Sequence, residues 1–151
     1  SRRLGLDPAE TRVVGLAAEL HDIGKMAIPD AILDKRAELN SADAAFMQRH
    51  TVIGERIVAA APALMSIAPL VRSSHERVDG RGYPDGLAGS EIPLASRIVA
   101  VCDAYDAMVS GRHYREPVAV TDATAELRRC AGTQFDPSVV EALSAVLAED
   151  G

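Results

Sequence analysis

Aromatic residues are scarce in this sequence. They make up only 3% of the 151 residues: two Phe, three Tyr and no Trp. Alanine, in contrast, fills 26 positions. Strands favour β-branched and aromatic side chains, whereas alanine is the strongest helix former. The composition therefore favours an all-α domain, and a chain of this length can bury a core without disulfides or a structural metal.

Other absences exclude several classes of protein. The sequence has no apolar run of about 18 residues, so we expect no membrane-spanning helix, and its first residues lack the apolar core of a signal peptide. Two cysteines, Cys102 and Cys130, cannot build a disulfide framework, so we expect a reducing compartment and thiols that fill the core. The 22 acidic residues outnumber the 16 basic ones and give a net charge of −6, which argues against binding to a nucleic-acid polymer. A small anionic ligand at a local positive site is still compatible with this charge.

Helix signals recur along the whole chain. Asp7-Pro8-Ala9-Glu10 combines a capping Asp, Pro at the first helical position and Glu at the third, and predicts a helix that runs into His21-Asp22 and ends near Gly24. Further helices are predicted at 31–35, from Asn40-Ser41 through Val58, from Leu64 to His75, from Pro93-Leu94 through Met108, and after caps at Thr121 and Asp136-Pro137. Asp79 to Pro93 is rich in Gly and Pro and predicts a loop. The result is a single bundle of about six or seven helices.

Histidine and aspartate residues occur where a metal site would need them. His21-Asp22 pairs an imidazole with a carboxylate, donors that suit Fe, Mn or Zn. Lys25 follows four residues after His21, on the same face of the predicted helix, as a contact for a bound anion. His50 is expected to face the core, and Asp103 lies in an otherwise apolar helix, where an unpaired carboxylate is costly. Taken alone, His50 could be an ordinary core histidine and Asp103 could pair with an arginine. Together with His75, they are better explained by one metal site.

Several segments resemble one protein family, in order and at its spacing. His21-Asp22-Ile23-Gly24-Lys25 resembles the signature of the HD phosphohydrolase superfamily, and the segment from His75 to Pro84, HERVDGRGYP, resembles that of its HD-GYP subgroup. Three further segments match the same subgroup: 50–54 with the middle histidine, 92–107 with Asp103, and 132–137. Because the matches span nearly the whole chain, residues 1–151 are identified as an HD-GYP domain.

The resemblance implies an all-α, metal-dependent phosphodiesterase that converts cyclic di-GMP, a bacterial second messenger, to linear pGpG, GMP or both. It implies two divalent transition-metal ions, with Fe or Mn first and Zn or Ni as alternatives, and a hydroxide between them as the nucleophile. The metal ligands that it implies are His21, Asp22, His50, His75 and Asp103, of which His21 and Asp22, with Lys25, are the catalytic residues. The substrate contacts that it implies are Lys25, Tyr83, Arg112 and Arg115, although the two arginines could instead form a solvated helix end.

The resemblance also implies partners and a cellular setting. Gly82-Tyr83-Pro84, expected as a rigid exposed point of the loop, would contact a GGDEF-type cyclase domain or act as a lid, unless the loop is a passive connector. A sensor or receiver domain is expected upstream, and a homodimer is a further expectation. His113 matches no ligand of the family and is expected to be exposed. The substrate places the domain in the bacterial cytoplasm.

Two departures from the family pattern bear on activity. Ser74 stands where the family usually has a histidine, and a hydroxyl is a poorer ligand than an imidazole for these metals. The chain also begins about where an earlier helix of the family usually ends, and Arg2-Arg3-Leu4 resembles the tail of that helix. Three functions therefore stay open: an active phosphodiesterase, a degenerate domain that binds cyclic di-GMP or a protein without hydrolysis, and an HD phosphohydrolase with another phosphate substrate. The retained site residues favour the first.

Overall fold

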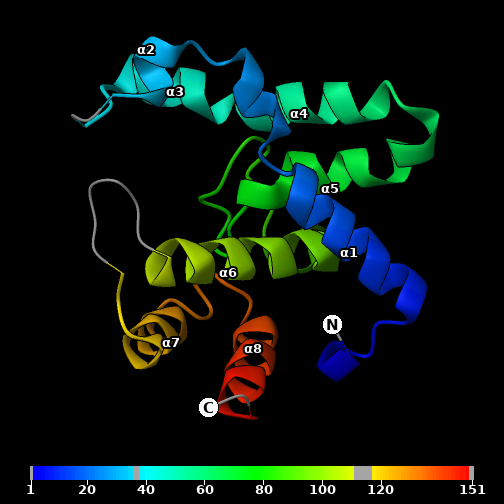
Figure 1. Ribbon diagram of the computed structural model, residues 1–151, viewed down its shortest axis with the longest axis vertical. Helices are drawn as coiled ribbons and strands as arrows, with labels where there is room; N and C mark the ends of the chain where they lie inside the picture. The colour runs from blue at the N-terminus through cyan, green and yellow to red at the C-terminus, as the bar shows by residue number, and fades with distance from the viewer. Residues whose placement is uncertain (1, 36–37, 111–116, 150–151) are drawn as a thin grey trace.

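The computed structural model describes residues 2–35, 38–110 and 117–149, and these ranges form an all-α fold (Figure 1). Their α-helices are α1 (Pro8–Leu20), α2 (Asp30–Leu33), α3 (Ser41–Gln48), α4 (His50–Ala59), α5 (Ala68–Arg72), α6 (Leu94–Val109), α7 (Val120–Arg129) and α8 (Pro137–Glu149). Five short 3-10 helices accompany them: η1 (Arg2–Leu4), η2 (Ile23–Ala27), η3 (Pro62–Ile67), η4 (Ser73–His75) and η5 (Gly89–Glu91). The predicted helical bundle is confirmed, and within the described ranges β-pairing is limited to isolated bridges.

Helix α6 is the central element of the bundle. In Figure 1 it crosses the middle of the molecule, with α4 and α5 above it and α7 and α8 below it. Its Val99 belongs to a core cluster with Ala17 of α1 and Val71 of α5, whereas its Val101 belongs to a second cluster that includes Leu127 of α7. Residues four positions apart share a helix face, so Asp103 lies on the same side of α6 as Val99, toward α1 and α5.

Three predicted helix boundaries are wrong, and one cause explains them. The first helix ends at Leu20 rather than near Gly24, the predicted helix 41–58 is divided at Arg49 into α3 and α4, and the predicted helix 64–75 ends as the 3-10 turn η4. At each break a side chain bonds to the carbonyl three residues earlier: His21 to Ala18, His50 to Met47, Thr51 to Gln48, and Ser74 to Val71. Such bonds compete with the helical backbone ladder. Two of the candidate metal ligands thereby lie at helix breaks: His21 directly follows α1, and His50 begins α4 after the break from α3.

The predicted helix caps are mostly confirmed. The Asp7 side chain accepts hydrogen bonds from the backbone N–H groups of Ala9 and Glu10, and the Glu10 side chain accepts one from the backbone N–H of Asp7, which completes a capping box. Asn40 caps α3 in a similar way. Thr121 is not a cap, because α7 starts one residue before it, after Ala119, whose carbonyl already accepts from Asp122 and Ala123.

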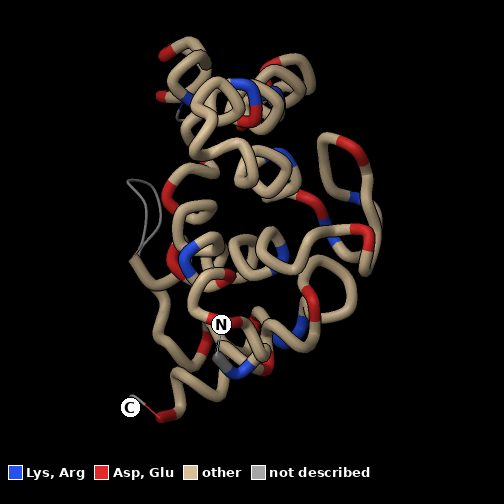
Figure 2. Tube along the Cα trace, turned by 90° about the vertical axis from the view of Figure 1, so that its right-hand side faces the viewer, with Lys and Arg blue, Asp and Glu red and all other residues tan. Residues whose placement is uncertain are grey.

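The surface observations correct one prediction. Cys102 is exposed rather than part of the core, and Cys130 is half-buried. Cys102 lies on α6 beside the buried Val101 but lines an open groove with residues of η1 and α8. Figure 2 shows acidic and basic residues interspersed along the chain. Among the described residues, we find no helix that has both the length and the apolar character needed to cross a membrane.

Candidate metal centre

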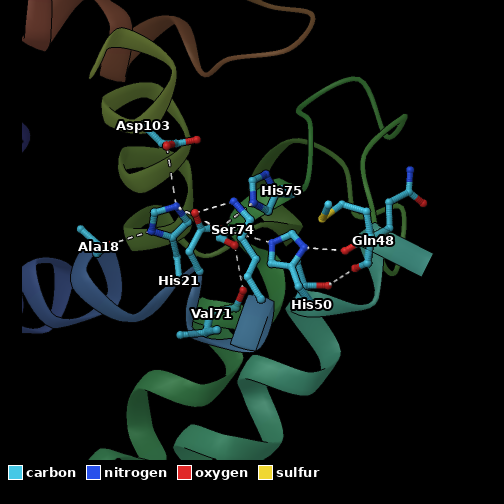
Figure 3. Close-up of polar contacts among 12 residues, drawn as sticks. Ala18, His21, Gln48, His50, Val71, Ser74, His75 and Asp103 are labelled. Carbon is cyan, nitrogen blue, oxygen red and sulfur yellow. Dashed lines mark hydrogen bonds and ion pairs between the residues drawn. The ribbon is translucent and has the colours of Figure 1, made fainter. Parts of the chain in front are cut away.

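The side chains of His21, His50 and His75 lie close together (Figure 3), and each has its Nε2 atom within 4.0 Å of the Oδ1 atom of Asp22. The distances from Asp22 Oδ1 are 3.5 Å to His50 Nε2, 3.6 Å to His21 Nε2 and 4.0 Å to His75 Nε2. Asp103 Oδ1 lies 3.7 Å from His21 Nε2. The five residues come from the end of α1, the turn after it, the start of α4, η4 and α6. The fold thus brings together all five residues that the sequence comparison proposed as ligands.

Among the described residues, the atoms at the centre of this cluster have no hydrogen-bond partner. The Nε2 atoms of His21, His50 and His75 and the Oδ1 atom of Asp22 are all buried and unbonded. Separations of this size are too long for hydrogen bonds, but two ligands that each lie about 2.1 Å from a metal are about 3 to 4 Å apart. Buried polar atoms without partners are costly. The donors of His21, Asp22 and His75 lie within 4.8 Å of one another, so the residues present fit a metal ion.

Backbone carbonyls orient two of the imidazole rings. His21 Nδ1 lies 2.7 Å from the carbonyl oxygen of Ala18, and His50 Nδ1 lies 2.7 Å from that of Met47. A carbonyl only accepts, so Nδ1 carries the proton in each ring and Nε2 presents its lone pair to the centre. The same i–3 bonds that end the helices therefore fix the tautomer that a metal ligand needs.

The charges around the centre favour ionised carboxylates and a neutral His50. Burial alone would raise the pKa of Asp22, but the neighbouring His75 and Lys25 outweigh it and hold that pKa well below its usual range. His21 lowers the pKa of Asp103 against the opposing effect of burial, and burial lowers the pKa of His50. In these protonation states Asp22, Asp103 and His50 bind a cation. Burial alone would lower the pKa of His21, but the neighbouring Asp103 and the bond to the Ala18 carbonyl outweigh it and raise that pKa, so a metal ion has to compete with a proton at this ring.

Lys25 lies beside the cluster, but it does not belong to a continuation of α1. It belongs to η2 and not to the helix of His21, so the prediction that the two share a helix face is wrong. Its Nζ lies 2.5 Å from Asp22 Oδ2, the carboxylate oxygen that faces away from the three imidazoles. The ammonium group is one-third exposed and is thus accessible to an anion at the edge of the cluster.

Two of the predicted ligands differ in exposure. The side chain of His50 is 2% exposed, as its inward orientation predicted, whereas that of Asp103 is 35% exposed. Asp103 is therefore not the buried carboxylate that the apolar sequence of α6 indicated. Asp103 lines the cavity next to the histidines, and its side chain is partly open to solvent there.

Tyr83 packs against the cluster. Its ring stacks on that of His75 with centroids 5.2 Å apart and an interplanar angle of 13°, and its backbone N–H donates to the His75 carbonyl. Burial, together with the charges of Asp22 and Asp103, raises the pKa of Tyr83 to about 12, so the phenol is neutral. The loop point that was expected to be exposed is instead half-buried, because the aromatic ring finds apolar contact with an imidazole face.

A cavity of about 350 Å³ opens next to the cluster. His75, Tyr83 and Asp103 line it, together with residues that the sequence analysis did not single out: Gln48, Arg77, Arg81 and Gln134. Arg81 could have been predicted to line the site, because it is a basic residue inside the loop motif. Gln48 and Gln134 carry no such signal, since only the packing of α3 and the 131–135 turn against the loop brings them there. The predicted contacts Arg112 and Arg115, like His113, lie outside the described residues.

Glu76 holds the loop in place. Its side chain accepts hydrogen bonds from three successive backbone N–H groups, those of Asp85, Gly86 and Leu87, at 2.7, 3.1 and 3.1 Å. The residue is 4% exposed, so these charge-assisted bonds are shielded from water. This role of Glu76 has no signal in the sequence, because no local pattern shows that the turn at 85–87 folds back onto it.

Ser74 does not contribute a ligand from its position next to His75. It is 1% exposed, and its hydroxyl donates to the Val71 carbonyl at 2.8 Å. The hydroxyl hydrogen is thus already used within the chain, whereas a histidine at this position would bring an additional imidazole to the cluster.

Ser74→His is expected to raise the amount of Fe or Mn bound per chain, measured by elemental analysis after loading and desalting. The control is Ser74→Ala, which removes the hydroxyl and is expected to leave the metal content unchanged. A lower metal content in Ser74→Ala would show that the hydroxyl serves as a ligand after all. An unchanged content in a folded Ser74→His would show that the cluster holds its metal without a residue at this position.

Comparison with known proteins agrees with this geometry. The family model described as "HD domain" matches residues 1–139 of the chain. This chain belongs to the HD-domain family. The HD-GYP subgroup that the loop motif indicated is confirmed with it. HD-domain phosphohydrolases are metal-dependent, which agrees with the His/Asp cluster of this chain.

Curated relatives of this HD domain are named as cyclic dinucleotide phosphodiesterases. The chain is 43% identical to the cyclic di-GMP phosphodiesterase response regulator RpfG of Xanthomonas campestris pv. campestris, covering 95% of this chain and 38% of the relative. It is 42% identical to a cyclic di-GMP phosphodiesterase of Thermotoga maritima, with 94% and 39% covered. A third relative, 38% identical with 92% and 27% covered, is the 3'3'-cGAMP-specific phosphodiesterase 2 of Vibrio cholerae. The chain thus spans less than half the length of these relatives.

Solved structures share the fold. The cyclic GMP-AMP specific phosphodiesterase V-cGAP3 of V. cholerae superposes with a TM-score of 0.75 at 21% identity, covering 97% of this HD domain and 40% of that chain. Bd1817, an HD-GYP-type protein of Bdellovibrio bacteriovorus, gives a TM-score of 0.74 at 22% identity, with 97% and 47% covered. At this identity the likeness establishes the fold of the helices around the cluster.

Proposed function

We propose that this HD domain is a metal-dependent phosphodiesterase that hydrolyses cyclic di-GMP to linear pGpG, GMP or both. The observation that supports this most directly is the group of three unbonded imidazole nitrogens within 4.0 Å of one oxygen of Asp22. Curated relatives at 42–43% identity that are named for this activity support the choice of substrate.

Each residue of the cluster has a role that its geometry supports. His21, Asp22, His50, His75 and Asp103 would hold the metal, which supplies Lewis acidity and an activated water when bound. Lys25 is held at the edge of the cluster by Asp22 and presents a positive charge to a phosphate of the substrate and to its transition state. Tyr83 keeps the ring of His75 in place by stacking and, as a neutral phenol, offers a hydrogen-bond donor beside the cavity.

Several finer points belong to the same proposal. Two ions, Fe or Mn in preference to Zn or Ni, suit the mixture of imidazole and carboxylate donors. The loop 82–84 is proposed as a contact for a GGDEF-type domain through the part that remains exposed after Tyr83 packs inward. Arg112 and Arg115 are proposed to bind the phosphates of the substrate. A sensor or receiver domain upstream, a homodimer and a cytoplasmic location complete the proposal.

One observation favours a second candidate function, binding without hydrolysis. The hydroxyl of Ser74 bonds to the backbone and leaves the cluster with one imidazole fewer than the family usually has. A domain that retains its cavity but loses a metal could still bind the nucleotide and signal through a partner.

Removal of metal is expected to abolish turnover of cyclic di-GMP, and reloading with Fe or Mn is expected to restore it, as followed by chromatography of the products. Ca²⁺ is the control cation, since it prefers oxygen ligands and should not restore activity to a histidine-rich site. Hydrolysis that survives complete chelation would contradict the proposed function. Binding of cyclic di-GMP without any turnover in the reloaded protein would instead establish the second candidate.

A further inference from the structure

The cavity next to the cluster has a polar wall that the metal chemistry does not use. Its volume of about 350 Å³ falls in the range of small-molecule sites. His75 and Asp103 line the cavity and belong to the candidate metal centre. Gln48, Arg81 and Gln134 line the same cavity, and within the described ranges their side chains form no hydrogen bond with a candidate metal ligand. A substrate whose phosphate reaches the metal centre must place its neighbouring groups against this wall.

The two arginines of the wall differ in availability. Arg77 donates to Asp79 through Nε at 3.0 Å and Nη2 at 2.7 Å, so its planar fork is already occupied. Arg81 bears the same charge, but its guanidinium makes no hydrogen bond or ion pair within the ranges that the structure describes. Its charge is attracted by the nearby Asp79, but the side chain is exposed and its donors can meet a ligand in the cavity.

The backbone that carries Arg81 is held on both sides. Its own N–H donates to Asp79 Oδ1 at 3.1 Å. The next residue, Gly82, approaches so closely that a Cβ there would lie 2.4 Å from the Arg77 nitrogen and 2.5 Å from the Glu76 Cα. Beyond it, Glu76 holds the turn at 85–87. Because the backbone at Arg81 is already fixed, binding costs little backbone conformational entropy, and the cost is limited to the rotamers of the side chain.

Guanidinium chemistry indicates what this side chain recognises. Guanine presents two adjacent acceptors, O6 and N7, which match the two donors of an arginine fork. Adenine presents N7 as an acceptor and N6 as a donor, so one arginine donor would face a like group. Cyclic di-GMP carries guanine on both sides of the phosphates, and 3'3'-cGAMP carries it on one.

We infer that Arg81 reads a guanine base of the substrate and thereby makes this site selective for guanine-containing cyclic dinucleotides. The inference rests on the proposed function for its substrate class. It adds the residue that selects the base, and it assigns the cavity between the loop and α6 as the subsite for that base.

The experiment compares Arg81→Ala with wild type on cyclic di-GMP and on the all-adenine analogue cyclic di-AMP. In the metal-loaded protein, Arg81→Ala is expected to raise the KM for cyclic di-GMP about tenfold to a hundredfold, with kcat little changed. This is the discrimination that one bidentate contact to a base provides. The inhibition constant of cyclic di-AMP is expected to stay within about twofold, because adenine makes no such contact. Arg12→Ala, an exposed arginine on α1 away from the cavity, is the matched control and is expected to change neither constant.

Arg81→Lys separates base recognition from simple charge attraction. Lysine keeps the charge but lacks the planar fork, so it is expected to recover little of the lost KM. Full recovery with lysine, or an equal loss for cyclic di-AMP, would mean that Arg81 attracts phosphates and would overturn the inference while leaving the proposed function intact.

Calorimetry on the metal-free protein distinguishes failure of the inference from failure of the proposed function. Suppose that the metal-loaded wild type does not hydrolyse cyclic di-GMP, whereas the metal-free wild type binds it in preference to cyclic di-AMP. If Arg81→Ala removes that preference, the inference stands and the hydrolytic function fails. If the wild type neither binds nor hydrolyses cyclic di-GMP, both fail.

Discussion

Asp22→Asn is expected to remove the bound metal and to lower turnover of cyclic di-GMP by more than about 100-fold. Mutation of a residue that only hydrogen-bonds to a metal ligand costs up to about 100-fold, and the loss of a ligand itself should cost more. Asp22 Oδ1 lies within 4.0 Å of all three imidazole nitrogens, so the loss of its charge affects the whole cluster. Asparagine keeps the shape but loses the anion that balances a cation. Elemental analysis and a turnover assay measure the two effects.

The control for this variant is Asp122→Asn, which makes the same chemical change at an exposed position in the first turn of α7. It is expected to leave metal content and turnover unchanged. If Asp22→Asn retained full metal content with full activity, the placement of the reaction centre at Asp22 would be wrong. Normal metal content with lost activity would instead assign Asp22 to the reaction and not to metal retention.

Gly24→Ala is expected to destabilise the fold by about 3 kcal/mol or more, at the upper end of the cost of overpacking. A Cβ at this position would lie 1.9 Å from the His50 carbonyl oxygen and 2.6 Å from the Gly54 nitrogen. Both are backbone atoms, so no flexible side chain can yield, and η2 must move away from α4. That movement would separate Asp22 from His50 and weaken metal binding as well. Chemical denaturation measures the loss of stability.

Gly15→Ala provides the matched control for Gly24→Ala. Gly15 lies inside α1, and a Cβ there would meet nothing within 4 Å. Alanine is the better helix former, so this variant is expected to gain about 0.5 to 1 kcal/mol. Equal stability of the two variants would show that the approach of η2 to α4 is looser than the structure has it.

The sequence was informative where a local signal decides the outcome. The capping box at Asp7 predicted the start of α1, and the alanines and apolar spacing of 94–108 predicted α6 nearly to its last residue. The site was more predictable than the fold around it, since the four segments that resemble the HD-GYP subgroup (21–25, 50–54, 75–84 and 92–107) pointed to His21, Asp22, His50, His75 and Asp103, and these five residues lie close together. Prediction was poorest for the helix ends at 21, 49 and 73–75. At these positions His and Ser side chains bond to the carbonyl three residues earlier and compete with the helix, and such bonds cannot be predicted from the spacing of apolar residues.

The sequence alone indicated the candidate residues for the chemistry and the alanine-rich helical bundle in which they lie. The tertiary structure decided how these residues meet. The backbone contact at Gly24 places Asp22 beside His50, and Glu76 folds the loop back so that Tyr83 stacks on His75 and Arg81 joins the cavity. These arrangements depend on close approaches between segments that are far apart along the chain. Local propensity and spacing describe a segment and its near neighbours, so they carry no information on which backbone will lie against it.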